Sequence, residues 1–466
     1  MKAQARKTVG IDDMAAYVPH LYLPIATLAE ARDLEYEKLN KGLGLEAMAI
    51  ADAREDAATM MANAVRELID KNHLDPRSIG RLYLGTESAL DGAKPTATYA
   101  LEMLEAYYTP EYGPDCFLNC DVVDLTFACI GAVDALQNTL DWVNGGENRL
   151  GIVVASDNAK YEMGSGGEYT QGAGAVALLV KQQPRLLAID PTWGVATRPV
   201  YDFFKPLRKV KRGDLIAEVL QLANRNHVDI DALIERLDAT IAVDGVIDSN
   251  VRELAIHRET PVFDGPYSNL CYQNRIREAL DHYRRQVGSE KEEPVATAWD
   301  RLAFHLPYAF QARRMFGEIF WQEASLTGQR EALTAQIGME APRKADFTDE
   351  VEYQKALVKF WRAVTKTDSY RQFVRERIAK GERASSLVGN VYTGSLFLSM
   401  MSTLETDLTD GDLEAGATLG CFAYGSGSKS KVFTTRLQPQ WREVVAGFGL
   451  FGRLSARQVI DYPTYE

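Results

Sequence analysis

Residues 124–143 read DLTFACIGAVDALQNTLDWV and decide the fold. A strand-like stretch ends at Cys129, and the apolar residues that follow recur at helical spacing as far as two glycines at 145–146. A thiol in the first turn of a helix lies near unpaired backbone N–H groups and the positive end of the helix dipole, which favour the thiolate. Cysteine is also a common small core residue, so its position alone leaves both roles open.

Strand and helix patterns alternate along the first half of the chain. A strand is predicted at 8–19, and amphipathic helices are predicted over 55–72 and 95–108. The stretches 149–157 and 174–180 are continuous apolar runs, which are typical of strands buried on both faces of a sheet. The strand-like stretch before Cys129 is predicted to begin at residue 116. The pattern indicates an α/β protein in which helices cover a mixed or parallel sheet.

The second half is less regular. Amphipathic helices are predicted over 213–237 and 273–286, and a highly charged helical excursion from the core is predicted at about 328–383. Strand, glycine-rich turn and helix patterns return over 385–404 and 416–437. We therefore predict two halves, 1–190 and 191–466, as diverged copies of one α/β unit.

Charge and cysteine content exclude several classes of protein. The formal net charge of −13 argues against nucleic-acid binding. Five cysteines are too few for a disulfide scaffold, and their spacing does not suit a zinc site, so we expect a cytoplasmic protein without metal. The first residues lack the apolar segment of a secretory signal, and no apolar run has the length of a membrane span.

Two more residues could carry chemistry. Glu87 follows an apolar strand in a loop of Gly, Thr and Ser, where partial burial would raise its pKa and suit it to proton transfer. His305 follows another apolar strand and precedes Leu-Pro, which places its ring at a strand end. Each is, taken alone, more often a solvated loop residue or a satisfied core histidine. Glycine-rich turns at 167–174, 389–395 and 423–431 could approach a ligand or simply pack in the core.

Short motifs, taken in order, resemble those of the hydroxymethylglutaryl-CoA synthase family of the thiolase superfamily. They are GTES and DGAKP (85–95), ACIGAVDAL (128–136), SDNAKYEMGSGGEYTQGAGAVALLV (156–180), YDFFKP (201–206), PVFDGPYSNLCY (261–272), FHLPY (304–308), GNVYTGSLF (389–397) and YGSGS (424–428). The match extends from about residue 8 to about residue 435. The resemblance implies a five-layered αβαβα core built from two similar halves, and a homodimer.

The resemblance also implies an enzyme with a cysteine, a glutamate and a histidine. Cys129 falls on the acylated nucleophile, Glu87 on the general acid and base, and His305 on the histidine that positions the second acyl thioester. The other positions that match the family's pocket are Asn390, Tyr161 and Ser426. In this family the cysteine takes an acetyl group from acetyl-CoA, and the acetyl carbon attacks acetoacetyl-CoA. Water then releases (S)-3-hydroxy-3-methylglutaryl-CoA for the mevalonate pathway, without a metal or redox cofactor.

One departure from the family's pattern concerns the residues that bind CoA. Members that use free acetoacetyl-CoA usually carry a lysine five positions after the histidine, where this chain has Phe310. The next basic residues are Arg313 and Arg314, and Arg314 falls on a second basic position of the motif, where a cation could contact the CoA phosphates. Lys205 and Lys211 are further candidates for phosphate contacts.

Three alternatives remain open at this point. A β-branching relative would condense onto a ketone held by an acyl carrier protein; Phe310 favours it, but the acidic total gives no support for a basic docking surface. A ketoacyl synthase would share Cys129, His305 and Asn390 but has no need of Glu87. A catalytically silent scaffold that binds acyl-CoA has no need of nucleophile, base and histidine together.

Overall fold

A computed structural model describes residues 8–225, 227–240, 253–257, 259–289, 293–411 and 413–466. The chain divides into two compact units. The main unit comprises Met1–Asp202 and Asp264–Glu466, and the second unit comprises Phe203–Phe263. No described helix is long and apolar enough to cross a membrane.

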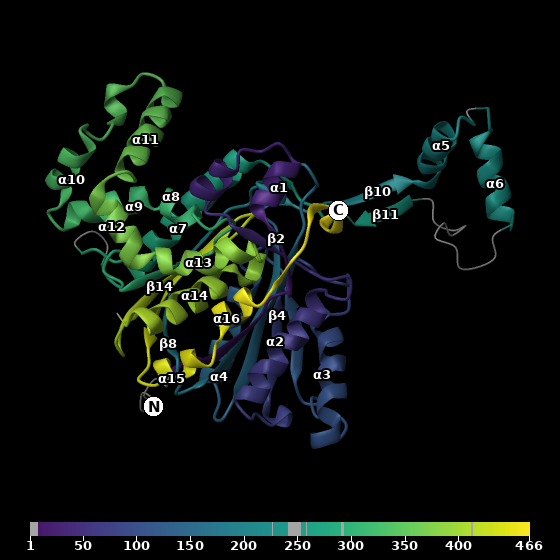
Figure 1. Ribbon diagram of the computed structural model, residues 1–466, viewed down its shortest axis with the longest axis horizontal. Helices are drawn as coiled ribbons and strands as arrows, with labels where there is room; N and C mark the ends of the chain where they lie inside the picture. The colour runs from purple at the N-terminus through teal and green to yellow at the C-terminus, as the bar shows by residue number, and fades with distance from the viewer. Residues whose placement is uncertain (1–7, 226, 241–252, 258, 290–292, 412) are drawn as a thin grey trace. The chain divides into compact units, whose positions relative to one another are not determined.

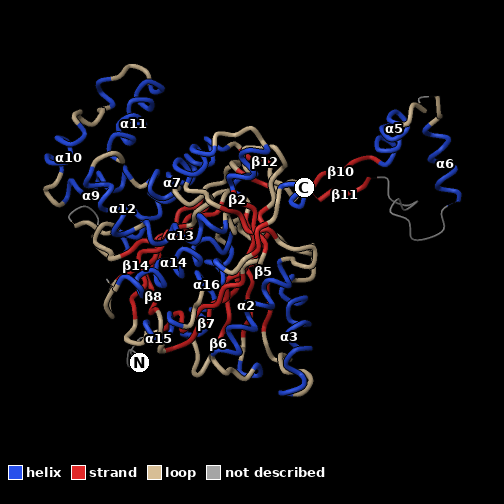
Figure 2. The backbone as a smooth tube through the Cα atoms, viewed as in Figure 1, coloured by secondary structure: helices blue, strands red, loops and turns tan. Residues whose placement is uncertain are grey.

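One nine-stranded sheet runs through the main unit in the order β13-β14-β15-β8-β1-β7-β6-β4-β5 (Figure 2). Its strands are β1 (Val9–Tyr17), β4 (Arg81–Gly85), β5 (Asp121–Leu125), β6 (Leu150–Ala159), β7 (Gly172–Gln182), β8 (Leu187–Thr197), β13 (Arg301–Phe304), β14 (Thr418–Gly425) and β15 (Lys429–Leu437).

The two parts of this sheet repeat one pattern of strand pairing. In the first part β4 and β6 are parallel, and β7 runs antiparallel to both β6 and β1. In the second part β13 and β14 are parallel, and β15 runs antiparallel to both β14 and β8. Among the described strands, only β5 has no counterpart in the second part. The parts join where Gly10 pairs with Ala188, and glycine is required there because a Cβ would lie 2.0 Å from the Leu187 carbonyl oxygen.

Helices and the two parts of the sheet alternate in five layers (Figure 1). The helices α2 (Ala57–Lys71) and α3 (Thr96–Tyr112) cover the outer face of the first part, and α7 (Gly265–Gln286) covers that of the second. Between the two parts lie α4 (Gly131–Asn144) and α14 (Ser395–Asp410), whose apolar side chains share one hydrophobic cluster with strands of both parts. The predicted α/β class with a thiolase-like architecture is therefore confirmed.

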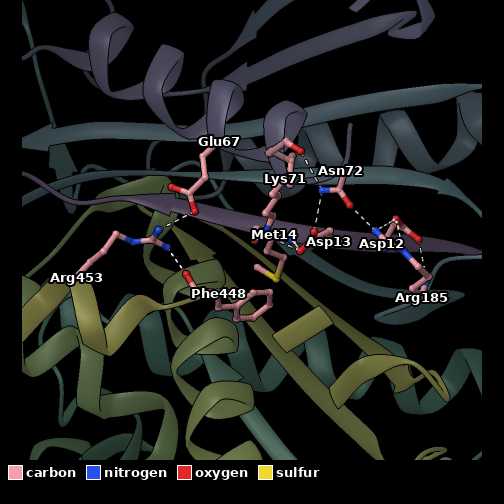
Figure 3. Close-up of polar contacts among 10 residues, drawn as sticks. Asp12, Asp13, Met14, Glu67, Lys71, Asn72, Arg185, Phe448 and Arg453 are labelled. Carbon is pink, nitrogen blue, oxygen red and sulfur yellow. Dashed lines mark hydrogen bonds and ion pairs between the residues drawn. The ribbon is translucent and has the colours of Figure 1, made fainter. Parts of the chain in front are cut away.

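Buried charges reinforce the strand at the centre of the sheet. A bulge in β1 between Ile11 and Asp13 accompanies two buried aspartates (Figure 3). Asp12 accepts hydrogen bonds from Arg185, in the turn between β7 and β8, at 2.6–2.9 Å. Asp13 accepts bonds of 2.8 Å from Lys71 and Asn72 at the end of α2. Both carboxylates are thereby paired, as buried charges must be.

A small sheet and two short helices complete the N-terminal and C-terminal parts of the main unit. The strands of this small sheet lie in the order β16 (Gln458–Val459), β2 (Leu21–Pro24) and β3 (Ala47–Ile50). Here α1 (Ile25–Ala31), through Leu28, and α17 (Tyr462–Tyr465) pack in one hydrophobic cluster with Tyr169 and Tyr308. The helices α15 (Trp441–Ala446) and α16 (Leu450–Ser455) come directly before β16 in the chain.

Two strand predictions are wrong. Residues 115–119 form turns, and only Asp121–Leu125 of the stretch before Cys129 is a strand. Residues 385–388 end the helix α13 (Ala379–Val388) instead of forming a strand. A run of four residues containing Leu387 and Val388 is too short for its periodicity to distinguish a strand from a buried helix end.

The charged segment at about 328–383 is helical, as predicted; residues 329–359 are mostly exposed, whereas the part from Phe360 onward enters the core. The segment forms α10 (Arg330–Ile337), α11 (Glu350–Val364) and α12 (Asp368–Arg377), which follow α8 (Gln311–Met315) and α9 (Gly317–Leu326). Its aromatic residues Phe360, Tyr370 and Phe373 are buried in the cluster that contains Phe304 of β13. The charges lie on the outer faces of these helices, whereas the inner faces extend the core.

The described residues of the second unit form two helices and two short strand pairs. The helices α5 (Arg212–Leu222) and α6 (Ile230–Thr240) lie where helices are predicted. The strands β10 (Leu207–Lys211) and β11 (Glu253–His257) pair antiparallel, as do β9 (Phe203–Phe204) and β12 (Val262–Phe263). Lys205 and Lys211 belong to this unit, so their contact with CoA phosphates stays a prediction.

Candidate active site

Cys129 lies directly before α4, not in its first turn as predicted. The helix begins at Gly131 after Ile130, and Ala128 has a φ of 39°, so the chain turns sharply between β5 and the helix. Two close backbone approaches fix this turn. A Cβ on Gly85 would lie 2.1 Å from the Ala132 nitrogen, and one on Gly131 would lie 2.5 Å from the Leu125 carbonyl oxygen. The end of β4 and the start of α4 are therefore in direct contact.

This contact brings Glu87 to Cys129. Glu87 follows β4 by two residues, and the Cys129 Sγ donates a hydrogen bond of 2.8 Å to the Glu87 Oε1. Both side chains are only partly buried, so reactants can reach them. A carboxylate within hydrogen-bonding reach of a thiol can accept its proton, and can later exchange a proton with a group bound to the sulfur.

Asp157, which sequence reasoning missed, holds the loop that carries Glu87. Its carboxylate is 0% exposed and lies near the end of β6. One oxygen accepts bonds from the Glu87 N–H at 2.7 Å and from the Thr86 and Ser88 hydroxyls at 3.0 Å. The other accepts from the Thr393 N–H at 3.0 Å and from the Thr393 hydroxyl. The available signal was an acidic residue within an otherwise apolar strand, which must find partners when buried.

His305 occupies a buried position at the end of β13. The residue is 2% exposed, and its backbone N–H donates to the Phe422 carbonyl oxygen at 2.9 Å. Its ring lies 6.4 Å from the rings of Tyr272 and Tyr424, and its Nδ1 has no hydrogen-bond partner among the described residues. Burial lowers the pKa of His305 to about 3, so the imidazole is neutral at physiological pH.

The pKa of His305 predicts an acid-sensitive fold. Between pH 6.5 and 3 the unfolded chain binds a proton on this ring that the folded chain does not, so stability falls as the pH falls. Relative to a His305→Gln variant, the wild-type free energy of unfolding should decrease by about 1.4 kcal/mol per pH unit below 6.5. Urea titrations at pH 7.5, 6, 5 and 4.5 check this. Parallel curves for the two proteins would show that the ring is protonated in the folded state.

Tyr161, Asn390 and Tyr392 lie together beside the cysteine and the glutamate. The Asn390 N–H donates to the Thr170 carbonyl oxygen at 2.9 Å, and the Asn390 Oδ1 accepts from the Tyr392 N–H at 2.9 Å. Burial raises the pKa of Tyr161, and the negative charges of Cys129 and Glu87 raise it further. The structure thus brings Tyr161 and Asn390 to the same pocket wall as the Cys129–Glu87 pair.

The turn that contains Ser426 lies against the segment before Cys129. A Cβ on Gly425 would lie 2.7 Å from the Phe127 carbonyl oxygen. Ser426 hydrogen-bonds to Tyr424, whose hydroxyl donates to the buried Asp202 at 2.6 Å. Since the Tyr424 ring also contacts His305, this turn connects the histidine and the cysteine segments.

The basic residues near Phe310 differ in their accessibility. The Phe310 ring packs onto Gly44, where a Cβ would lie 2.5 Å from the ring, and the Arg313 guanidinium lies 3.7 Å from its centroid. Arg313 forms an ion pair with the buried Glu382. Arg314 is exposed on α8, and among the described residues its side chain contacts the Gly42 carbonyl oxygen at 3.5 Å and the Tyr308 ring.

Family models and known relatives match most of the chain. The family model described as hydroxymethylglutaryl-coenzyme A synthase N terminal matches residues 5–184, and the C terminal model matches 254–465. A hydroxymethylglutaryl-CoA synthase of Haloferax volcanii is 29% identical over 462 residues, which are 98% of this chain and 90% of that protein. One from Enterococcus faecalis is 29% identical over 441 residues, which are 95% and 84% of the two chains.

Solved structures of HMG-CoA synthases also match nearly the whole chain. MvaS in complex with 3-hydroxy-3-methylglutaryl coenzyme A is 27% identical with a TM-score of 0.72, and the match covers 98% of this chain and 91% of that one. An HMG-CoA synthase complexed with CoA is 25% identical with a TM-score of 0.67, over 98% and 89%. The HMG synthase of the curacin pathway, at 21% identity and a TM-score of 0.68, covers 98% and 87% and shares the fold.

The strand order and the cysteine in front of the central helix define an enzyme of the thiolase-like class. Both family models, which together leave only residues 185–253 unmatched between them, narrow this class to one family. The chain belongs to the hydroxymethylglutaryl-CoA synthase family.

Proposed function

We propose that this chain condenses acetyl-CoA with acetoacetyl-CoA and water to give (S)-3-hydroxy-3-methylglutaryl-CoA and CoA. The observation that carries the proposal is the 2.8 Å hydrogen bond from the Cys129 thiol to the Glu87 carboxylate. The names of the relatives support it, as do the HMG-CoA and CoA complexes of two similar structures.

In the first step Cys129 attacks the acetyl carbonyl of acetyl-CoA. The thiol proton passes to Glu87, and the new bond forms between sulfur and the acetyl carbon. The bond from that carbon to the CoA sulfur breaks, and CoA leaves as the thiol by taking the proton from Glu87, which returns to the carboxylate. The positive end of the α4 dipole, which lies beside Cys129, suits the oxyanion that develops. The product is acetyl-Cys129.

In the second step Glu87 removes a methyl proton from the acetyl group. The resulting carbanion attacks the ketone carbon of acetoacetyl-CoA, and Glu87 returns the proton to the new alkoxide. His305, which is neutral, can donate a hydrogen bond to the ketone oxygen without carrying charge into a buried site. Water then cleaves the enzyme thioester. The reaction sequence involves no net oxidation or reduction, so it needs no redox cofactor, and we propose that no metal takes part.

Intact-protein mass spectrometry after incubation with acetyl-CoA tests the proposal. Wild-type protein should carry one acetyl group, and addition of acetoacetyl-CoA should discharge it as HMG-CoA. Cys129→Ser should carry none, whereas Cys120→Ser, which removes another partly exposed thiol, should behave as wild type. Absence of an adduct on the wild-type protein would overturn the proposal.

Phe310 replaces the lysine that is usual in the family, and this replacement bears on which acyl acceptor the chain uses. A carrier-bound acceptor is the second candidate function, and the apolar Phe310, whose ring packs on Gly44, favours it because this residue itself supplies no cation. An acetyl adduct that free acetoacetyl-CoA fails to discharge would support this second candidate.

Arg314 is the exposed cation closest in sequence to Phe310, and we propose that it contacts CoA phosphate. Arg314→Ala should raise the KM for acetyl-CoA about tenfold and leave kcat unchanged, because the lost contact is remote from the reacting atoms. Arg371→Ala, which removes an exposed arginine of α12, is the matched control. An unchanged KM in Arg314→Ala would exclude this contact.

We propose that the chain works as a cytoplasmic homodimer. Five cysteines without disulfides suit a reducing compartment. Among the described strands β5 has no neighbour on its outer side, and apolar side chains are exposed beside it, including Leu118 at 73%. An open edge with an apolar surround favours pairing with a second copy. Light scattering of wild type and Val123→Lys, which adds a charge on this edge, tests the dimer.

A further inference from the structure

The loop between β6 and β7, residues 160–171, forms one wall of the active site. It begins with Tyr161, whose ring lies 6.3 Å from that of Tyr392 and packs onto Gly167, where a Cβ would lie 2.2 Å from the ring. The loop therefore determines where the Tyr161 ring lies relative to Cys129 and Glu87. Two anchors hold it from outside the pocket.

The first anchor is the side chain of Gln171, which is nearly buried. Its Oε1 accepts a hydrogen bond from the Tyr161 N–H at 2.7 Å, and its Nε2 donates to the Tyr465 hydroxyl at 2.8 Å. One amide thus connects the start of the loop to α17, although Gln171 and Tyr465 are 294 residues apart in the chain.

The second anchor is Glu168, which is 2% exposed. Its carboxylate accepts bonds from the Gly164 N–H at 2.7 Å, from two nitrogens of Arg32 at 2.8 and 3.1 Å, and from the Tyr465 hydroxyl at 3.1 Å. A paired contact between a guanidinium and a buried carboxylate is strong and directional. The same tyrosine hydroxyl therefore reaches both anchors.

The hydroxyl of Tyr465 sets the orientation of the Gln171 amide. It has a single proton, and the carboxylate of Glu168 can only accept, so that proton goes to Glu168. The hydroxyl oxygen must then accept from the Gln171 Nε2, which leaves the Gln171 Oε1 facing the Tyr161 N–H. Without the hydroxyl, the amide loses the partner that fixes this orientation.

The same cluster touches the histidine segment. Tyr465 and Tyr169 pack in the hydrophobic cluster that contains Tyr308, three residues after His305. This cluster lies against both the loop and the FHLPY segment, and Tyr465 is its polar connection to the loop.

We propose that Tyr465 is a positioning residue, which acts through Gln171 and Glu168 to hold Tyr161 over the acetylated cysteine. The inference rests on the proposed function and adds a residue for which neither the family resemblance nor the mechanism above has a role. A correctly placed loop favours the condensation of acetyl-Cys129 and keeps water away from the thioester until the new bond has formed. A loosened loop favours premature hydrolysis.

The test compares Tyr465→Phe with Tyr462→Phe. The Tyr462 hydroxyl bonds only to Glu466 among the described residues, so its removal should change nothing. Tyr465→Phe should lower kcat about tenfold with little change in KM, and should raise the fraction of acetyl-enzyme that is hydrolysed instead of condensed. Gln171→Met should reproduce this shift, and the double variant should add little to it, because both act through one contact.

Acetylation and thermal stability separate the possible outcomes. Tyr465→Phe that acquires the acetyl group as wild type does, yet condenses and hydrolyses it in the wild-type ratio, would overturn the positioning role alone. A lower melting temperature with an unchanged ratio would assign Tyr465 a purely structural role and also overturn it. Failure of the wild-type protein to accept an acetyl group would instead overturn the proposed function.

Discussion

Glu87→Gln should lower kcat for HMG-CoA formation by about 10³-fold while Cys129 still becomes acetylated. The amide keeps the size of the side chain beside the Cys129 Sγ but can neither take the methyl proton nor return it to the alkoxide. Acetylation requires only that the thiol reaches the thiolate state, which the start of α4 also favours. The variant should therefore accumulate as the acetyl-enzyme.

Rapid-quench mass spectrometry measures both quantities on one sample, the acetylated fraction and the HMG-CoA formed per second. Glu111→Gln, on the exposed surface of α3, controls for loss of a carboxylate in general. Equal losses of acetylation and condensation in Glu87→Gln would contradict the assignment of Glu87 to carbon–carbon bond formation. They would place its role in activating the thiol.

Asp157→Ala should destabilise the fold by about 3–5 kcal/mol. The substitution removes the acceptor of the Glu87 and Thr393 N–H groups, and it removes it at a position where the Asp157 side chain is fully buried. Urea denaturation measures the free energy of unfolding. Asp190→Ala removes an exposed aspartate of β8 and should change stability by less than about 0.5 kcal/mol. Equal stability of the two variants would contradict the role of Asp157 as a hub.

Asp157→Asn separates charge from shape. Each carboxylate oxygen faces donors only, so the NH₂ group of an asparagine would face donors in either orientation of the amide. The loop of Glu87 should shift, and kcat should fall about 10²-fold even where the variant folds. Wild-type kcat in a folded Asp157→Asn protein would show that the loop keeps its position without this carboxylate.

Local patterns in the sequence predicted the α/β class and most of the main-unit elements, because apolar runs and amphipathic helices record which faces are buried. The resemblance pointed to Cys129, Glu87 and His305. The contact between Cys129 and Glu87 depends on how β4 packs against the start of α4, which no local pattern records. Asp157 escaped detection because its partners lie 70 and 236 residues away in the chain, beyond the reach of any local pattern.

The charged helices of residues 328–383 also show what a local pattern cannot predict. Charge density over 328–383 predicted a solvated excursion, and residues 329–359 are mostly exposed, but the aromatic side chains of Phe360, Tyr370 and Phe373 bury the later part. In the second unit, the helices follow from their periodicity, whereas the pairing of β10 with β11 joins segments separated by two helices and gave no local signal.

The position of β1 in the middle of the sheet has a consequence for how the chain acquires its structure. This strand leaves the ribosome well before its neighbours β7 and β8, which begin only at Gly172 and Leu187. The charge of Asp12 can be paired with Arg185 only after the chain has been extended by a further 173 residues. Pairings of such long sequence separation close slowly. Until then the nascent chain holds an apolar, unpaired strand that a chaperone would be expected to shield.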